Sequence, residues 1–178
     1  MLGSLGALVA PAATPLHERM ARQNRLVSQG AEVAAAPWNT NIIPHQMTRE
    51  QLLQGIRWLC NRLYQPSAFG ERVLRFMDSL GRRRARRHSK GERDPIGDLR
   101  PVDHDSLALV LKFERLGPEE KELWSRITRE LYKKPELLGF VKGTLLQYMQ
   151  IRYMYEQGHF WESRPALKPP PLQSALSI

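Results

Sequence analysis

The chain has 178 residues, 42% of them apolar and 25% charged, which is the composition of a folded globular protein and excludes a wholly disordered or fibrous one. Its net charge of +9 and its pI near 10.1 favour an anionic partner, although a solvated basic loop would also account for them. The single cysteine, Cys60, excludes an internal disulfide and any zinc or iron-sulfur site made only of cysteines from one chain.

The expected location follows from two features of the apolar residues. No run of about 18 apolar residues occurs, so no membrane-spanning helix is expected. The apolar N-terminus has no basic residue before it, which disfavours a secretory signal. We therefore expect a cytoplasmic protein, with a peripheral position at the inner membrane face as an extension of that expectation.

Residues 1–38 are predicted to form a strand, a helix and a linker. Leu2–Ala10 is a short apolar run that suits a buried strand of a parallel sheet. Thr14 precedes Pro15, and this pair is typical of a helix start. Residues 28–38 are rich in alanine and lack a clean period, which indicates a loop. An amphipathic N-terminal arm is the alternative to the strand.

The next stretch, from Asn39 to Leu80, is predicted to form an extended segment and two helices. Thr48 and Gln51 make a capping-box pattern at the first helix start, whose loss would cost about 1 kcal/mol. This helix carries an apolar stripe that we expect to be buried: Leu52, Leu53, Ile56, Leu59, Cys60 and Leu63. After the break at Pro66, a second helix has its own inner stripe: Phe69, Val73, Phe76, Met77 and Leu80.

Residues 81–103 contain almost no apolar side chain and are predicted to be a mobile basic loop. Guanidinium groups bind phosphates, so the loop supplies the candidate anion contacts: Arg82, Arg83, Arg84, Arg86, Arg87, Lys90 and Arg93. Nucleic acid, another polyanion or anionic lipid would suit them. The loop lacks aromatic side chains for stacking on bases, and a solvated linker remains an open alternative.

Three further helices are predicted before a disordered tail. Asp105 or Ser106 is expected to begin the first, Gly117-Pro118 separates it from the second, and Pro135 begins the third. Residues 163–178 are proline-rich and are expected to be extended and exposed. The fold class is thus mainly α, with about five or six helices and a short N-terminal strand.

One group of residues resembles a known family. The region that follows the catalytic barrel in cobalamin-binding radical SAM proteins of the hopanoid-methylase type has an Asn-(Phe/Ile)-Ile-Pro segment, a Met, a Tyr-x-Pro junction and an Arg-Val pair. The chain resembles it at Asn41, Ile42, Ile43, Pro44, Met47, Tyr64, Pro66, Arg72 and Val73. The resemblance implies that residues 1–38 are the remnant of a last barrel βα unit and its linker, and that residues 39–162 are a helical C-terminal domain.

The resemblance also limits the expected chemistry. Full-length relatives imply S-adenosylmethionine, a [4Fe-4S] cluster and cobalamin, and the cluster needs three cysteines in a Cys-x3-Cys-x2-Cys pattern that this chain lacks. We therefore assign no catalytic, cofactor-binding or metal-binding residue, and the five histidines are dispersed. The chain is expected to be a non-catalytic accessory domain that joins a separate radical SAM catalytic chain. The alternative is a small basic helical module that binds nucleic acid or another polyanion through Arg82–Arg93.

Overall fold

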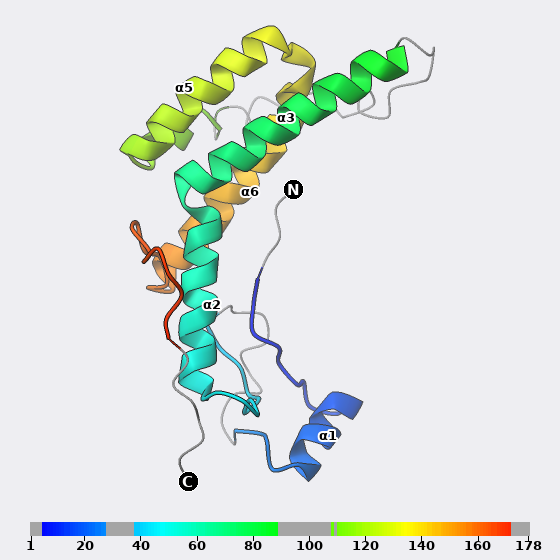
Figure 1. Cartoon of the computed structure of the whole chain (residues 1–178), viewed down its shortest axis with the longest axis vertical. Coiled ribbons are helices and arrows are strands. Elements are labelled where there is room, and N and C mark those ends of the chain that lie inside the picture. Colours follow the sequence, from blue (N-terminus) through cyan, green and yellow to red (C-terminus); the bar gives the residue numbers. More distant parts are fainter. Residues whose placement is uncertain (1–4, 28–37, 89–107, 109, 172–178) are drawn as a thin grey trace. The chain divides into compact units, whose positions relative to one another are not determined.

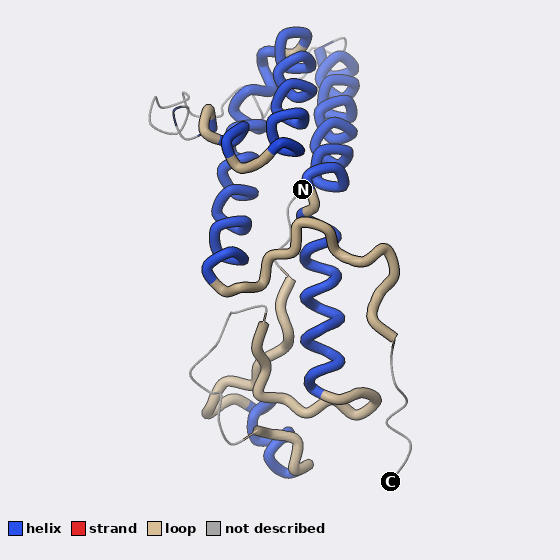
Figure 2. Tube along the Cα trace, turned by 90° about the vertical axis from the view of Figure 1, so that its left-hand side faces the viewer, coloured by secondary structure: helices blue, strands red, loops and turns tan. Residues whose placement is uncertain are grey.

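The computed structural model describes residues 5–27, 38–88, 108 and 110–171. Its helices are α1 (Pro15–Arg22), α2 (Arg49–Tyr64), α3 (Pro66–His88), α5 (Pro118–Lys133) and α6 (Leu138–Gln157), with short 3₁₀ helices η1 (Phe113–Arg115) and η2 (Pro135–Leu137). The described part is mainly helical, as predicted, and its connections are loops (Figures 1 and 2). None of the described helices has both the length and the apolarity needed to cross a lipid bilayer.

Two compact units divide the chain. Unit 1 comprises residues 1–2 and 64–159, and unit 2 comprises residues 3–63 and 160–178. The long helices α3, α5 and α6 therefore belong to unit 1. Helix α1 and nearly all of helix α2 belong to unit 2, together with the C-terminal segment.

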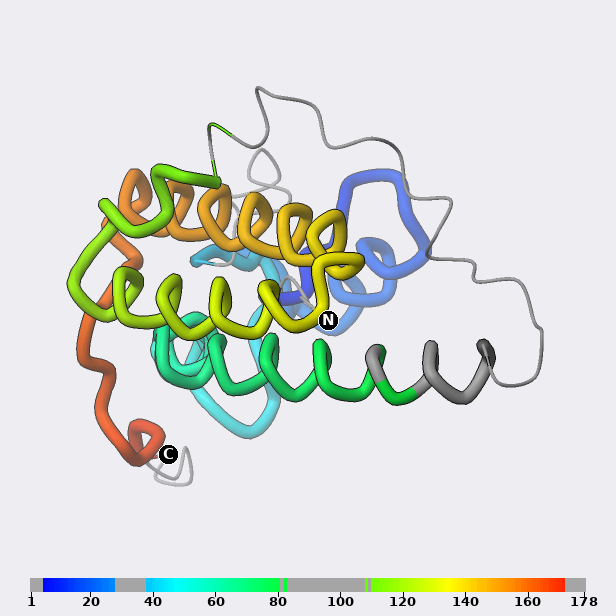
Figure 3. The backbone as a smooth tube through the Cα atoms, turned by 90° about the horizontal axis from the view of Figure 1, so that it is seen from above, coloured from blue at the N-terminus to red at the C-terminus, as the bar shows by residue number. Residues whose placement is uncertain are grey.

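The core of unit 1 lies where α3, α5 and α6 run side by side (Figure 3). Tyr148 of α6 is fully buried, with its ring centroid 4.5 Å from that of Phe69 and 5.4 Å from that of Phe113. Gly70 lets α3 approach α5 closely, because a Cβ atom at this position would overlap the side chain of Leu123. Tight packing of aromatic rings around one buried tyrosine thus joins the helices of this unit.

Unit 2 has less regular structure, and its N-terminal part is built around a small apolar cluster. Ala10, Met20 and Ile42 are buried there, and Leu16 and Leu26 pack against them. The predicted strand over Leu2–Ala10 is not observed, because its described residues are irregular and the only β-pairing among the described residues is one antiparallel bridge between Leu26 and Ile42.

Two predicted helix starts in unit 2 are confirmed. The Thr14 hydroxyl accepts a hydrogen bond from the backbone N–H of His17 at 3.2 Å, and Pro15 is the first residue of α1. Thr48 and Gln51 form the reciprocal capping box, in which each backbone N–H donates to the other side chain at 2.9 and 3.1 Å.

The C-terminal segment, residues 160–171, is attached to α2 by side chains. Asn61 is fully buried, and its amide donates to the carbonyl of Phe160 at 2.9 Å and accepts from the N–H of Glu162 at 2.7 Å. The indole N–H of Trp58 donates to the carbonyl of Ala166 at 2.7 Å. Residues 163–178 were predicted to be a disordered tail, but in the described part of this stretch the carbonyl of Ala166 is bonded to Trp58 of α2.

The apolar stripe of α2 was predicted to be buried, and this prediction is wrong for most of its residues. Only Cys60 is buried, Leu59 is 40% exposed, and the other leucines and Ile56 are partly exposed. The described residues of unit 2 include no second long helix that could cover the stripe.

The first part of the predicted basic loop is helical instead. Helix α3 continues to His88, so residues 81–88 are helical. Arginine and alanine are strong helix formers, and Arg82 pairs with Asp78 one turn earlier at 2.9 Å, which favours continuation of the helix. Residues 89–103, and the predicted helix start at Asp105 or Ser106, lie outside the described residues.

Candidate functional site

Five of the predicted anion contacts lie at the C-terminal end of α3. Arg82 is largely exposed, and its guanidinium forms an ion pair with Asp78, which also lies 3.6 Å from the ammonium group of Lys134. Four more of the predicted contacts are in the helix, although the structure describes no side chain for them: Arg83, Arg84, Arg86 and Arg87. Lys90 and Arg93 lie outside the described residues. The structure thus brings five of the seven predicted contacts onto one helix end.

A second polar site is a charged cluster buried inside unit 1. Glu120, near the start of α5, is 2% exposed. Its Oε1 atom accepts hydrogen bonds from the hydroxyl of Tyr148 at 2.8 Å and from the guanidinium of Arg152 at 2.6 Å. Arg152 also donates to Glu156 at 2.6 Å. We call Glu120, Tyr148 and Arg152 the buried cluster.

The backbone at the start of α5 is shaped around this cluster. Gly117 precedes the helix, and a Cβ atom at this position would lie 2.7 Å from the Oε2 atom of Glu120. The absence of a side chain therefore allows the carboxylate to fold back over the helix start. This placement also brings the negative charge close to the positive end of the helix dipole.

The environment of the buried cluster changes the pKa of two of its members. Burial, together with the charge of Glu120, raises the pKa of the Tyr148 hydroxyl far above its usual range, so this group remains a hydrogen-bond donor. Burial tends to lower the pKa of Arg152, but the hydrogen bond to Glu156 and the charge of Glu120 outweigh it and raise this pKa. Tyr148 and Arg152 therefore keep their protons, which suits a structural role better than proton transfer.

A third polar site lies in unit 2, where residues 39–41 hold the N-terminal segment. The side-chain amide of Asn41 accepts from the N–H of Ala10 and donates to the carbonyl of Ala10, both at 2.8 Å. Thr40 donates its hydroxyl proton to the carbonyl of Leu8 at 2.5 Å. Arg49 donates to the carbonyl of Thr40 at 2.7 Å and so holds this segment on α2. Side chains therefore supply the hydrogen bonds that a neighbouring strand would make to the backbone of the N-terminal segment.

Sequence reasoning missed the buried cluster. Glu120 stands in the first turn of α5, where an acidic residue is ordinary because it interacts favourably with the helix dipole. The one available signal was the polar pair Tyr148 and Arg152, four residues apart on the helix whose other residues are largely apolar. Nothing in the sequence indicates that their common partner lies on another helix.

The residues present do not fit the [4Fe-4S] cluster that the resemblance implies. Cys60 is fully buried, and one thiol cannot supply the three thiolates of a [4Fe-4S] cluster. In the part of the chain that the structure describes, no three His, Cys, Asp or Glu side chains gather as metal ligands would. We therefore derive no catalytic step from the residues of this chain.

Comparisons with known proteins gave one match. A family model described as a domain of unknown function (DUF4070) matches residues 14–164, which include most of both units. Comparison with curated proteins and comparison with solved structures each gave no match.

The buried cluster predicts unequal effects of the same substitution at two ion pairs. Replacement of Arg152 by Met leaves the buried carboxylate of Glu120 without its cation and should lower the free energy of unfolding by about 3 kcal/mol. Arg126→Met removes the ion pair with Glu71, in which both side chains are more than 40% exposed, and should cost less than about 1 kcal/mol. Urea unfolding measures both changes. Equal losses would contradict the structural role of the cluster.

Proposed function

The chain belongs to the DUF4070 family, and we propose that it is a non-catalytic helical accessory domain of a cobalamin-dependent radical SAM enzyme. The observation that supports this proposal is that residues that carry the resemblance make structural contacts. Asn41 holds two segments together, and Ile42, Tyr64 and Val73 occupy core positions, so the resemblance at these residues concerns architecture. S-adenosylmethionine, the [4Fe-4S] cluster and cobalamin would be bound by a separate catalytic chain, with which this chain would associate in the cytoplasm.

Four of these residues, Asn41, Ile42, Tyr64 and Val73, show such structural roles. Asn41 bonds to the backbone of Ala10, and Ile42 beside it belongs to the apolar cluster of unit 2. In unit 1, the ring of Tyr64 lies 5.9 Å from that of Tyr155 in an edge-to-face arrangement, and Val73 is 3% exposed. Such contacts would preserve this sequence pattern in a domain that carries no reacting group.

The N-terminal part of unit 2 offers apolar surface to a partner. Leu8 is 65% exposed and Ile43 is 39% exposed, on the two segments that Thr40 and Asn41 hold together. Burial of two such side chains in an interface would contribute about 2 kcal/mol each. We place the contact with the catalytic chain here.

Association with a catalytic chain tests the proposal. The partner to use is a protein encoded beside this gene that has the Cys-x3-Cys-x2-Cys pattern and a cobalamin-binding domain. The two purified proteins should form a complex in sedimentation velocity, and the double variant Leu8→Ser, Ile43→Ser should weaken it at least about tenfold. Leu111→Ser is the matched control, because Leu111 is also exposed, at 54%, but lies in unit 1. Absence of any such neighbouring gene, together with failure to associate, would contradict the proposed function.

A second candidate function is the binding of a polyanion through the end of α3, and one observation favours it. Helix α3 continues through His88, so five arginines stand on a continuous helix. A helix presents its basic side chains along a fixed axis, which lowers the entropy lost when several of them bind phosphates together.

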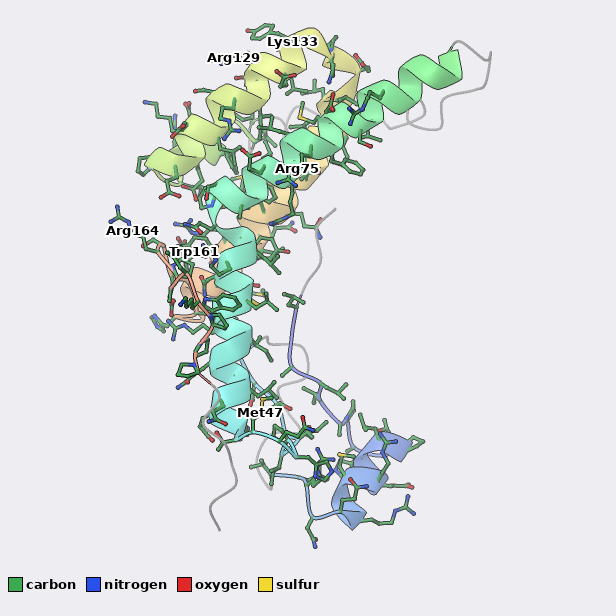
Figure 4. All side chains as sticks on the ribbon, in the orientation of Figure 1. Met47, Arg75, Arg129, Lys133, Trp161 and Arg164 are labelled. Carbon is green, nitrogen blue, oxygen red and sulfur yellow. The ribbon has the colours of Figure 1, made fainter. Side chains whose placement is uncertain are left out.

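Salt-dependent binding of duplex DNA tests this second function. The dissociation constant should lie near 10⁻⁴ to 10⁻⁶ M and rise steeply with salt. Replacing the five arginines between 82 and 87 by glutamine keeps the helix. It should reduce the slope of the logarithm of the binding constant against the logarithm of the salt concentration by about 4. The control replaces Arg75 on α3 and Arg129 on α5, whose side chains Figure 4 labels, and should reduce this slope less. Affinity that does not change with salt would exclude this function.

A further inference from the structure

A groove of about 320 Å³ lies between α2 and the C-terminal segment, both in unit 2. One wall is formed by apolar side chains at and before α2, among them Met47, Leu52, Ile56 and Leu59, and the other by Pro169–Pro171. Figure 4 labels Met47 at the N-terminal end of α2. The volume falls within the range of small-molecule sites, and the lining is largely apolar, as in such sites.

Gly55 forms part of the groove wall within α2. Glycine weakens a helix interior more than any residue except proline, so its presence there needs a reason. At Gly70 and Gly117 the reason is a neighbouring side chain that would meet a Cβ atom, but at Gly55 a Cβ atom would meet nothing within 4 Å. The absence of a side chain at Gly55 keeps the groove open down to the backbone of α2.

Gly143 shows that an unhindered glycine is not in itself a sign of a site. A Cβ atom there would also meet nothing within 4 Å. Gly143 lies on an exposed part of α6 in unit 1. It is therefore a suitable control position, while the argument for Gly55 depends on its place in the groove.

The apolar groove continues into a charged cavity of about 400 Å³. The two spaces share Gln54, Trp58 and Pro169–Pro171. The charged cavity is also lined by Arg57, Glu162 and Lys168, and the Nε atom of Arg57 lies 2.9 Å from the carboxylate of Glu162. That ion pair is neutral, so exposed Lys168 leaves one net positive charge at this end.

We propose that the groove and the charged cavity together bind a single-chain amphiphile with an anionic headgroup. The hydrocarbon chain lies along the apolar wall over Gly55, where water is displaced from the leucine, isoleucine and proline side chains. The phosphate or carboxylate head lies beside Lys168 and Arg57, where the net charge is complementary to it. The indole N–H of Trp58 is bonded to the carbonyl of Ala166, so Trp58 contributes its apolar ring to the wall. The site does not depend on the proposed accessory role.

Isothermal titration of the full chain, below the critical micelle concentration of each ligand, tests both parts of the ligand. Dodecyl phosphate and dodecanoate should each bind with one molecule per chain, and comparison of the two distinguishes the phosphate head from the carboxylate head. Dodecyl maltoside has the same hydrocarbon chain but a neutral head, and should bind at least about fivefold more weakly. Inorganic phosphate has the head alone and should give no detectable heat over the same concentration range.

Variants at matched positions distinguish the groove from general surface binding. Gly55→Leu fills the groove and should weaken dodecyl phosphate binding at least about tenfold, while the helix gains propensity and the chain stays folded by circular dichroism. Gly143→Leu makes the same exchange at the exposed position of α6 and should leave binding unchanged. Lys168→Glu should weaken dodecyl phosphate binding several-fold and leave dodecyl maltoside binding unchanged.

Three results would overturn the proposal. The first is dodecyl phosphate binding that Gly55→Leu leaves intact, and the second is equal affinity for the anionic and neutral amphiphiles. The third is a smaller molar mass of the Gly55→Leu variant in light scattering, which would mean that the groove holds a second copy of the chain. Binding to a catalytic chain is measured separately, so failure of the amphiphile site leaves the proposed accessory function untouched.

Discussion

Buried backbone groups must be hydrogen-bonded, and in unit 2 side chains meet this requirement. The described residues of this unit contain a single antiparallel bridge, so strand pairing cannot supply the partners. Asn41 bonds to both backbone groups of Ala10, and Asn61 bonds to the backbone of Phe160 and Glu162. Asparagine suits both positions because its amide donates and accepts at once. The placement of both terminal segments of unit 2 depends on these two residues.

In unit 1, a buried ion pair contributes to the placement of the helices. The core of this unit is built from aliphatic and aromatic side chains, but Glu120 and Arg152 place two opposite charges beside it. A buried ion pair adds little net stability, while an unpaired buried charge is costly. We interpret the pair as a device that fixes α5 against α6, because a shift of either helix would separate the charges.

Much of the helical structure could be predicted from local sequence. The starts of α1 and α2 follow from Thr14 with Pro15 and from Thr48 with Gln51, because capping involves residues that are neighbours in the chain. The buried cluster could not be predicted, since Glu120 lies 28 and 32 residues before its two partners. The open groove beside Gly55 could not be predicted either. The apolar stripe of α2 indicates that other apolar residues pack on it, but it does not indicate whether those residues belong to the same chain.

The central claim is that Asn41, one of the residues that carry the resemblance, holds the N-terminal segment in place, and amide hydrogen exchange at Ala10 tests it most directly. In Asn41→Leu, the side chain keeps about the same size but loses both the acceptor for the N–H of Ala10 and the donor to its carbonyl, at a site that is 3% exposed. We predict that the Ala10 amide exchanges at least about tenfold faster in the variant, while amides in α5 and α6 keep their rates. Unchanged exchange at Ala10 would contradict the account.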